Sequence, residues 1–212
     1  MTSSAARPRV RMTGPERRQQ LVEVGREIFA RRGYEATSME EVSARADVSK
    51  PVVYEHFGGK EGLYAAVVDG EMAQLLERFE SALSSGGQPR ELLERAALVL
   101  LDYIEDDTDG FRVLTRDAPL ASGTGTFSSL IGEVARRVEH ILEQQFGNRG
   151  YDRGLAELYS QALVGMVTLV GQWWLENRSP DKREVAAHLV NLAYNGLAHL
   201  DPAPELVDRP EG

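Results

Sequence analysis

Residues 37–64, TSMEEVSARADVSKPVVYEHFGGKEGLY, decide the fold expected of this 212-residue chain. Two overlapping capping boxes, one beginning at residue 37 and one at residue 38, predict a short helix over 39–46. Ser49 can cap a second short helix, which Gly58-Gly59 ends. Asp47 lies in the turn between them, where Asp tolerates a left-handed backbone. The stretch is therefore predicted to be a helix-turn-helix unit, followed by a long helix from Lys60.

A unit of this kind places its second helix in the DNA major groove while its first helix braces the backbone. Its inward-facing residues are expected to be Met39, Val42, Val48, Val53 and Phe57. We expect Lys50 to reach guanine acceptors and Val52 to pack on a thymine methyl group. The predicted base-facing residues are Ser49, Lys50, Pro51 and Val52, and the predicted phosphate partners are Thr37, Ser38, Tyr54, His56 and Lys60. For Tyr54 and His56, ordinary surface packing is the alternative.

The charge of the chain is distributed unevenly. The net charge is −9, but residues 1–60 hold 11 Lys and Arg against 8 Asp and Glu, and residues 61–212 hold 13 against 25. An electropositive head on an acidic body fits DNA contact by the head alone. The absence of Cys excludes disulfides and thiolate metal sites.

The rest of the chain also has helical periodicity, and no useful length alternates with the period of a strand. The fold class is predicted to be all-α, with about nine helices. Residues 1–13 are expected to be a disordered basic arm, in which Arg7, Arg9 and Arg11 either touch DNA or are solvated. The predicted organisation is a helix-turn-helix domain over 14–60, a helical ligand-binding and dimerisation domain over 61–200, and a disordered tail over 201–212.

The expected helices of the second domain are 60–83, 91–104, 127–146, 152–177 and one from Pro180 to Leu200, with about one turn at 111–115.

Several short motifs in the first 64 residues carry a resemblance to a known family. Gly33-Tyr34, Thr37-Ser38, the Ala-x-x-Ser-Lys turn region, Tyr54-x-x-Phe57 and Lys60-Glu61-x-Leu63 resemble the tetracycline-repressor (TetR) family of bacterial regulators. The resemblance covers residues 14–70. The sequence departs from the family pattern at Ser43, where Ala is usual, and at Asp47, where Gly is usual.

The resemblance implies dimerisation through the last two helices and a ligand site among the middle ones. The dimer is expected through residues 152–200, where Gly165 and Gly196 would allow close approach; an intramolecular core is the alternative. The ligand-binding residues are predicted to be Tyr103, Phe111, Arg112, Leu114, Arg116, Phe127, Leu130, Val134, Val138, Met166, Val170 and Trp174. Simple core packing is the alternative for each. The segment around Phe111 is similar to that of actinobacterial members that regulate fatty-acid metabolism, which implies a fatty acid or acyl-CoA as effector.

No catalytic motif is present, so the chain is not expected to be an enzyme, and no cofactor is expected. His140 and Glu143 could share a metal, but a solvated helix face is the more ordinary explanation. A cytoplasmic location is expected, because the N-terminus lacks a signal-peptide pattern and the apolar segment 162–175 is short and interrupted.

The predicted function is a dimeric regulator, repressor rather than activator, that binds a palindromic operator. A small hydrophobic effector would switch it by shifting populations through the helix after Lys60. The alternatives are an all-helical ligand carrier or enzyme with a vestigial helix-turn-helix, and a helical adaptor for protein partners. The effector's identity, the operator sequence and the target genes are not encoded in any pattern of the sequence.

Overall fold

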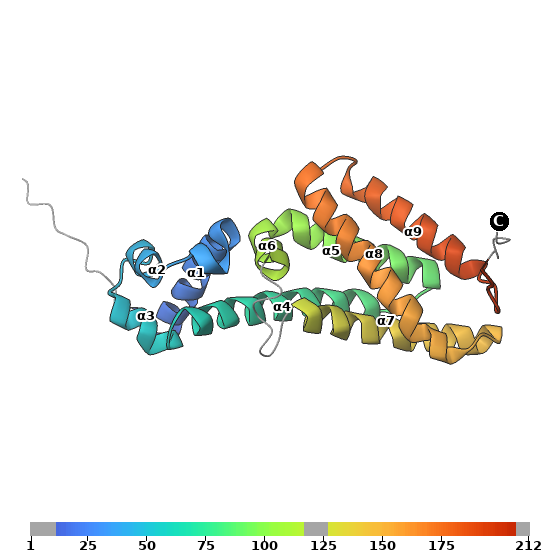
Figure 1. Ribbon diagram of the computed structural model, residues 1–212, viewed down its shortest axis with the longest axis horizontal. Helices are drawn as coiled ribbons and strands as arrows, with labels where there is room; N and C mark the ends of the chain where they lie inside the picture. Colours follow the sequence, from blue (N-terminus) through green and yellow to red (C-terminus); the bar gives the residue numbers. More distant parts are fainter. Residues whose placement is uncertain (1–11, 117–126, 207–212) are drawn as a thin grey trace, which may run out of the picture. The chain divides into compact units, whose positions relative to one another are not determined.

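The computed structural model describes residues 12–116 and 127–206, and the side chains of Arg116 and of residues 127–131 lie outside the description. Within these ranges the chain forms nine α-helices, one short 3₁₀ turn and no strand. The helices are α1 (Gly14–Ala36), α2 (Met39–Arg45), α3 (Lys50–Phe57), α4 (Lys60–Ser84), α5 (Pro89–Asp106), α6 (Thr108–Arg116), α7 (Phe127–Arg149), α8 (Ala156–Asn177) and α9 (Lys182–Ala198) (Figure 1). The predicted all-α class is confirmed. The predicted arm, residues 1–11, and the end of the predicted tail, residues 207–212, lie outside the described residues.

The chain divides into two compact units, and the boundary between Asp69 and Gly70 falls inside α4. The predicted domain boundary after residue 60 lies at the first residue of α4, nine residues before this division. Helix α4 therefore contributes its first residues to one unit and the remainder to the other.

The start of α1 and the turn near its end follow from local sequence. Thr13 caps the helix in a reciprocal capping box with Glu16, whose carboxylate accepts from the Thr13 backbone N–H at 2.7 Å. The backbone leaves the helical conformation at Gly33, where φ is 77°. Because a left-handed residue favours glycine, Gly33 suits the position at which the helix is interrupted.

The two short helices begin and end where their residues require. Ser38 caps α2 by accepting from the Glu41 N–H at 3.2 Å, so of the two predicted starting residues Ser38 is the N-cap. Asp47 takes a positive φ of 53°, and Gly58 ends α3 with a φ of 72°. Ser49 occupies the N-cap position of α3, but its side chain makes no capping hydrogen bond. The turn is thus as predicted, whereas the start of α3 lacks its predicted side-chain cap.

The first unit has a continuous apolar core that holds α2 and α3 against α1 and α4. Leu21, Val42, Val53 and Leu63, one from each of its four helices, are fully buried. Phe29, Tyr34 and Tyr64 form an aromatic cluster, in which the Tyr64 ring centroid lies 5.0 Å from each of the other two. Phe57 is half-buried, and the guanidinium of Arg18 lies 5.0 Å from the centroid of its ring. These contacts fix the orientation of α3.

In the second unit, α5 packs on α8 and α9, and α7 packs on α8. The irregular segment expected after Ile104 contains more helix than the single turn predicted for 111–115. Helix α6 spans nine residues, Thr108–Arg116, because Asp107 accepts from the Gly110 N–H at 2.9 Å and Phe111 and Leu114 are buried. The prediction of one turn was therefore too short.

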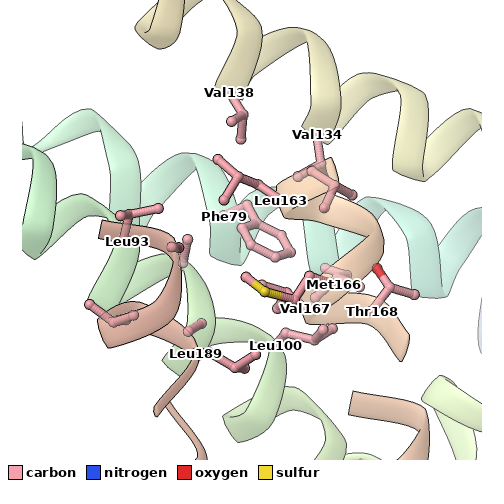
Figure 2. A pocket seen from close by; sticks show the side chains of 16 residues that line it. Phe79, Leu93, Leu100, Val134, Val138, Leu163, Met166, Val167, Thr168 and Leu189 are labelled. Atoms are coloured by element: carbon pink, nitrogen blue, oxygen red, sulfur yellow. The ribbon is translucent and has the colours of Figure 1, made fainter. Parts of the chain in front are cut away.

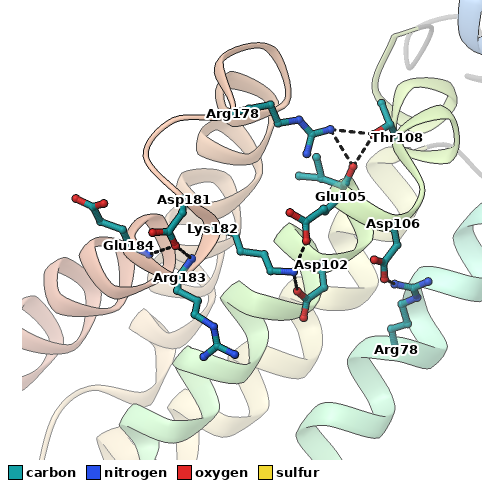
Figure 3. A network of polar contacts seen from close by, with 11 residues as sticks. Arg78, Asp102, Glu105, Asp106, Thr108, Arg178, Asp181, Lys182, Arg183 and Glu184 are labelled. Atoms are coloured by element: carbon teal, nitrogen blue, oxygen red, sulfur yellow. Dashed lines mark hydrogen bonds and ion pairs between the residues drawn. The ribbon is translucent and has the colours of Figure 1, made fainter.

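Polar contacts join the α8–α9 connection to the end of α5 (Figure 3). The ammonium of Lys182 binds Asp102 at 2.7 Å and also binds Glu105. Its hydrogen bond with Asp102, followed by that with Glu105, raises the Lys182 pKa well above its usual value. Arg178 donates to the carbonyl oxygen of Ile104 at 3.2 Å and to the hydroxyl of Thr108 at 2.9 Å. The start of α9 is thereby fastened to the α5–α6 corner.

Helix α8 is apolar over most of its length. The segment Arg153–Asn177 is long and apolar enough to cross a membrane by length and composition, and 22% of its most apolar window is buried. Residues 162–175, which were predicted to be too short to span a membrane, are only part of this longer segment. Core helices of soluble proteins meet the same criterion, and the exposed apolar side chains of this helix are described below.

Candidate nucleic-acid interface and apolar pocket

The exposed side of α3 carries most of the predicted base-facing residues. Ser49, Lys50, Pro51 and Tyr54 are exposed and Val52 is half-buried, whereas Val53 is turned into the core. We call Ser49, Lys50, Pro51, Val52 and Tyr54 the reading face. The structure therefore places all four predicted base-facing residues at the N-terminal end of one short helix, with Tyr54 one turn further along it.

Lys50 does not extend freely from this face. Its ammonium pairs with the carboxylate of Glu40 in α2, and it lies 5.6 Å from the centroid of the Tyr54 ring. The hydrogen bond from Lys50 lowers the Glu40 pKa below its ordinary value, and the same bond raises the Lys50 pKa. Both groups are therefore charged at neutral pH.

Two of the predicted phosphate partners have structural roles at the start of α2. The Thr37 side chain is 3% exposed, and its hydroxyl donates to the Gly33 carbonyl oxygen at 2.7 Å. This placement differs from the prediction of a DNA-facing hydroxyl, because Thr37 closes the end of α1. Ser38 is exposed, and its oxygen is the N-cap of α2. Ser43, a departure from the family pattern, is accommodated because its hydroxyl donates to the Glu40 carbonyl oxygen at 3.0 Å.

Of the other three predicted phosphate partners, Tyr54 is exposed, and His56 and Lys60 are half-buried. Lys60 donates to the carbonyl oxygens of Tyr34 and Glu35 at 2.9 and 3.2 Å, and its ammonium lies 4.4 Å from the Tyr34 ring centroid. It therefore binds the exposed carbonyls at the end of α1, where a cation is favoured. The His56 ring centroid lies 6.1 Å from that of Phe57.

The second unit contains an apolar pocket (Figure 2). Helices α4, α5, α7, α8 and α9 all contribute to its wall. Of the described residues that line it, Thr168 is the polar one and none is charged. The lining residues are Leu75, Phe79, Leu93, Ala96, Ala97, Leu100, Val134, Val138, Leu163, Val164, Met166, Val167, Thr168, Leu189, Val190 and Ala193.

The pocket shares three residues with the predicted ligand set: Val134, Val138 and Met166. Four other predicted residues, Tyr103, Phe111, Leu114 and Trp174, are buried in the core, which was the alternative interpretation for each. Arg112 pairs with Asp109 at 3.6 Å, and half-buried Val170 does not line the pocket. The side chains of Arg116, Phe127 and Leu130 lie outside the described residues.

The predicted ligand set contains none of the residues with which α4, α5 and α9 line the pocket. On α4 these are Leu75 and Phe79, and α5 and α9 also contribute small residues. The small residues are Ala96 and Ala97 on α5 and Ala193 on α9. Small residues on an otherwise apolar helix face were the available signal, because they leave space where larger residues would fill it. Three of the aromatic residues that were predicted to bind the ligand, Tyr103, Phe111 and Trp174, are instead buried in the core.

An apolar stripe on α8 and α9 is exposed. The exposed fractions are 62% for Leu158, 66% for Leu169, 49% for Trp173 and 65% for Leu192. A Cβ added at Gly165 or Gly196 would meet no atom within 4 Å, so packing within the chain does not require glycine at either position. We call Leu158, Leu169, Trp173 and Leu192 the apolar stripe.

The described residues contain no cluster of three or more His, Asp or Glu side chains suited to a metal ion. His140 and Glu143 lie on an exposed side of α7, with Nδ1 and Oε2 3.7 Å apart. This is the geometry of a solvated helix face.

Comparison with known families matches both units. Residues 21–67 match the family described as bacterial regulatory proteins, tetR family, and residues 89–196 match the tetracyclin repressor-like C-terminal domain. The HTH-type transcriptional activator FasR of Mycolicibacterium smegmatis is 32% identical over 195 residues, covering 90% of this chain and 87% of FasR.

Solved structures agree with these matches. A TetR-like transcriptional regulator from Rhodococcus sp. RHA1 superposes with a TM-score of 0.76 at 29% identity, covering 89% of this chain and 99% of that one. The fatty acid degradation regulator FadR from Bacillus halodurans shares the fold, with a TM-score of 0.74 at 16% identity and coverage of 90% and 100%. These proteins are named as regulators rather than enzymes. The chain belongs to the TetR family and is a DNA-binding transcriptional regulator.

Proposed function

We propose that this regulator works in the cytoplasm as a homodimer on a palindromic operator, and that an effector with a long aliphatic chain controls it. The observation that carries the effector proposal is the pocket between five helices, whose described lining is apolar apart from Thr168. Small-molecule sites are typically lined by apolar side chains with few polar groups.

For the DNA contacts, the reading face supports base contact by the N-cap residue of α3 and the three residues that follow it: Ser49, Lys50, Pro51 and Val52. Tyr54, His56, Lys60 and Ser38 are proposed as phosphate partners. Thr37 is not among the proposed contacts, since its hydroxyl is buried on Gly33. Lys60 serves a second purpose, because it also closes the end of α1.

The apolar stripe supports the dimer. Four large apolar side chains exposed on two neighbouring helices are a surface that a second copy covers in a two-fold arrangement. Gly165 and Gly196 would let the helices of two copies approach closely. Such a dimer would present its two reading faces to half-sites about 34–36 Å apart, one turn of the duplex.

The pocket lining favours a chain of methylene groups over a polar or ionic ligand. An effector wholly inside it would leave any buried charge unpaired by the described lining residues, and an unpaired buried charge is strongly disfavoured. A fatty acid or an acyl-CoA would insert its acyl chain and keep its polar head at the mouth. A fatty acid and an acyl-CoA have a long acyl chain in common, and this chain is the part that the pocket would bind.

Helix α4 supports a route from effector to DNA. It lines the pocket with Leu75 and Phe79, and it contributes Leu63 to the core of the first unit. An effector that binds two positions of α4 with different affinity shifts the population between them.

The test measures operator binding by fluorescence anisotropy with oleic acid, oleoyl-CoA and butyric acid. The operator is a duplex selected by the protein from a random pool. We expect both long-chain probes to change the dissociation constant about fivefold or more, and butyric acid to change it little. Oleic acid and oleoyl-CoA distinguish the free acid from the thioester.

A matched pair of variants on α8 locates the effect. Val167→Phe fills the pocket and should abolish the response, whereas Val170→Phe adds the same bulk outside the lining and should retain it. A full response in Val167→Phe would show that the acyl chain binds elsewhere.

The direction of regulation needs a separate measurement. Repression is the expectation from sequence, while the relative FasR is named an activator. A reporter behind the selected operator, with and without the regulator, decides between them: lower expression with the regulator supports repression and higher expression contradicts it.

A further inference from the structure

The ion pair between Glu40 and Lys50 differs from the other ion pairs of the first unit in its position. Glu27 pairs with Arg45 at 2.6 Å, joining α1 to the end of α2. The Glu40–Lys50 pair instead joins α2 to the first residue of α3, and Lys50 belongs to the reading face. Its side chains are 67% and 45% exposed, so the pair is open to any approaching duplex.

The local environment of Lys50 favours an anionic partner. The N-terminus of a helix carries a partial positive charge, and the first turn of α3 contains no acidic residue. Ser49 makes no side-chain capping hydrogen bond. The ion pair with Glu40 brings a carboxylate to the first residue of α3, whereas α1 and α2 have acidic residues in their own first turns.

In the presence of DNA, Glu40 competes with the duplex for Lys50. Sequence-independent affinity comes from cations that neutralise phosphates and release counterions. A Lys that already has a carboxylate partner neutralises a phosphate only after that pair separates. The carboxylate then left on the same face is repelled by the backbone. The pair therefore opposes binding to every sequence.

A G·C base pair can offset the cost of separating Glu40 from Lys50. Guanine presents two acceptors to a Lys in the major groove, and cytosine presents an amino group that a Glu can accept from. A duplex with a G·C pair opposite Lys50 can give both separated side chains a hydrogen-bond partner, whereas a phosphate can partner Lys50 alone.

We propose that Glu40 is a specificity-determining residue, which holds Lys50 away from phosphates and so favours operators that present a G·C pair to it. The proposal rests on the proposed position of Lys50 at the bases.

The test compares binding of the full-length protein to its selected operator and to a scrambled duplex of the same composition, by anisotropy over a range of KCl concentrations. Glu40→Gln keeps the size of the side chain and removes its charge. We expect it to tighten binding to the scrambled duplex about two- to fivefold at low salt, as expected for release of a surface ion pair. The slope of log affinity against log salt should steepen by about 0.9, the value for one additional phosphate contact.

Operator binding should change less than scrambled-duplex binding, so the ratio of the two affinities falls in Glu40→Gln. Glu27→Gln makes the same change of charge on a pair that does not involve the reading face, and should leave that ratio unchanged. In the double variant Glu40→Gln/Lys50→Met, the tightening on scrambled duplex should disappear. Thermal unfolding of each variant checks that the fold is retained.

Three results would overturn the proposal: an unchanged ratio in Glu40→Gln, the same fall in Glu27→Gln, or tightening that persists in the double variant. A different result bears on the position of Lys50. If Lys50→Met leaves operator binding unchanged, Lys50 does not contact the bases, and the proposed function loses this contact. If Lys50→Met weakens operator binding while Glu40→Gln leaves the ratio unchanged, the contact stands and the role of Glu40 fails.

Discussion

Gly110, in the first half of α6, has no room for a side chain. A Cβ at this position would overlap the carboxylate of Glu71 and the hydroxyl of Tyr103. These two groups are buried, and the Tyr103 hydroxyl donates to Glu71 at 2.6 Å. The glycine therefore allows α6 to pack directly on a buried polar pair that joins α4 to α5.

Gly110→Ala should lower the free energy of unfolding by about 2 kcal/mol, because one member of the pair must move within a close-packed core. Gly132→Ala in α7 is the matched control, since a Cβ there meets no atom within 4 Å. It should raise stability by about 0.5–1 kcal/mol, the usual gain from replacing a helical Gly by Ala. Urea unfolding measures both, and equal effects would contradict this account of Gly110.

The sequence predicts the conformation of a residue when that conformation depends only on its neighbours in the chain. The positive φ of Asp47 and Gly58 follows from neighbours in the chain, and the sequence predicts Asp47 in the turn and Gly58 at the end of the second short helix. The burial of Thr37 and the requirement for Gly110 depend on helices that pack from elsewhere in the sequence. No local pattern carries that information.

Among the elements, the connection between α8 and α9 contains a residue with a left-handed backbone, Arg178, whose side chain is held by hydrogen bonds. Arg178 ends α8 with a φ of 55°, a conformation that a non-glycine residue rarely adopts. Its guanidinium compensates by binding Ile104 and Thr108 and by lying 4.7 Å from the Trp174 ring centroid. The side chain thus supports a position where its backbone is disfavoured.

Two substitutions separate these contributions. Arg178→Ala and Arg178→Gly both remove the guanidinium contacts, but only Gly relieves the left-handed backbone. We expect Arg178→Ala to be less stable than the parent, and Arg178→Gly to be more stable than Arg178→Ala by about 1 kcal/mol. Thermal and urea unfolding give the difference, and equal stabilities would show that the backbone at 178 relaxes in the variants.

The lengths of most helices could be predicted because their caps and apolar periods lie within the helix. Helix α6 was underestimated because its start depends on Asp107 as a local acceptor, which was not recognised as a cap. The pocket could not be located, since its wall combines five helices whose order of packing is not visible in any one of them. Of the predicted ligand-binding residues, Val134 and Val138 on α7 and Met166 on α8 line the pocket.

At the scale of the whole molecule, the apolar stripe on α8 and α9 is the largest departure from an ordinary water-facing helix surface among the features described above. Its leucines and Trp173 are between 49% and 66% exposed in the single chain. Scattered exposed apolar residues are normal, but four on two neighbouring helices indicate an interaction surface. The same surface explains why α8 meets a membrane-span criterion.

Leu169→Glu should convert the proposed dimer to a monomer, because two carboxylates would be buried across the two-fold axis without partners. Operator affinity should fall by about 10²-fold or more, since simultaneous binding of two half-sites is lost. Leu206→Glu, the same change at a leucine that is 94% exposed and outside α8 and α9, should leave both properties intact. Sedimentation velocity and anisotropy provide the measurements, and a dimeric Leu169→Glu would place the interface elsewhere.

The boundary between the two units lies within α4, between Asp69 and Gly70, and this restricts how such a protein can be recombined. Modules joined by a loop can be exchanged with little regard to the number of residues at the junction. A helical junction must preserve phase, because each added residue rotates everything beyond it by about 100°. Seven added residues restore the phase to within about 20°. A chimera that attaches this reading unit to another effector unit therefore has to match the register of α4 as well as its sequence.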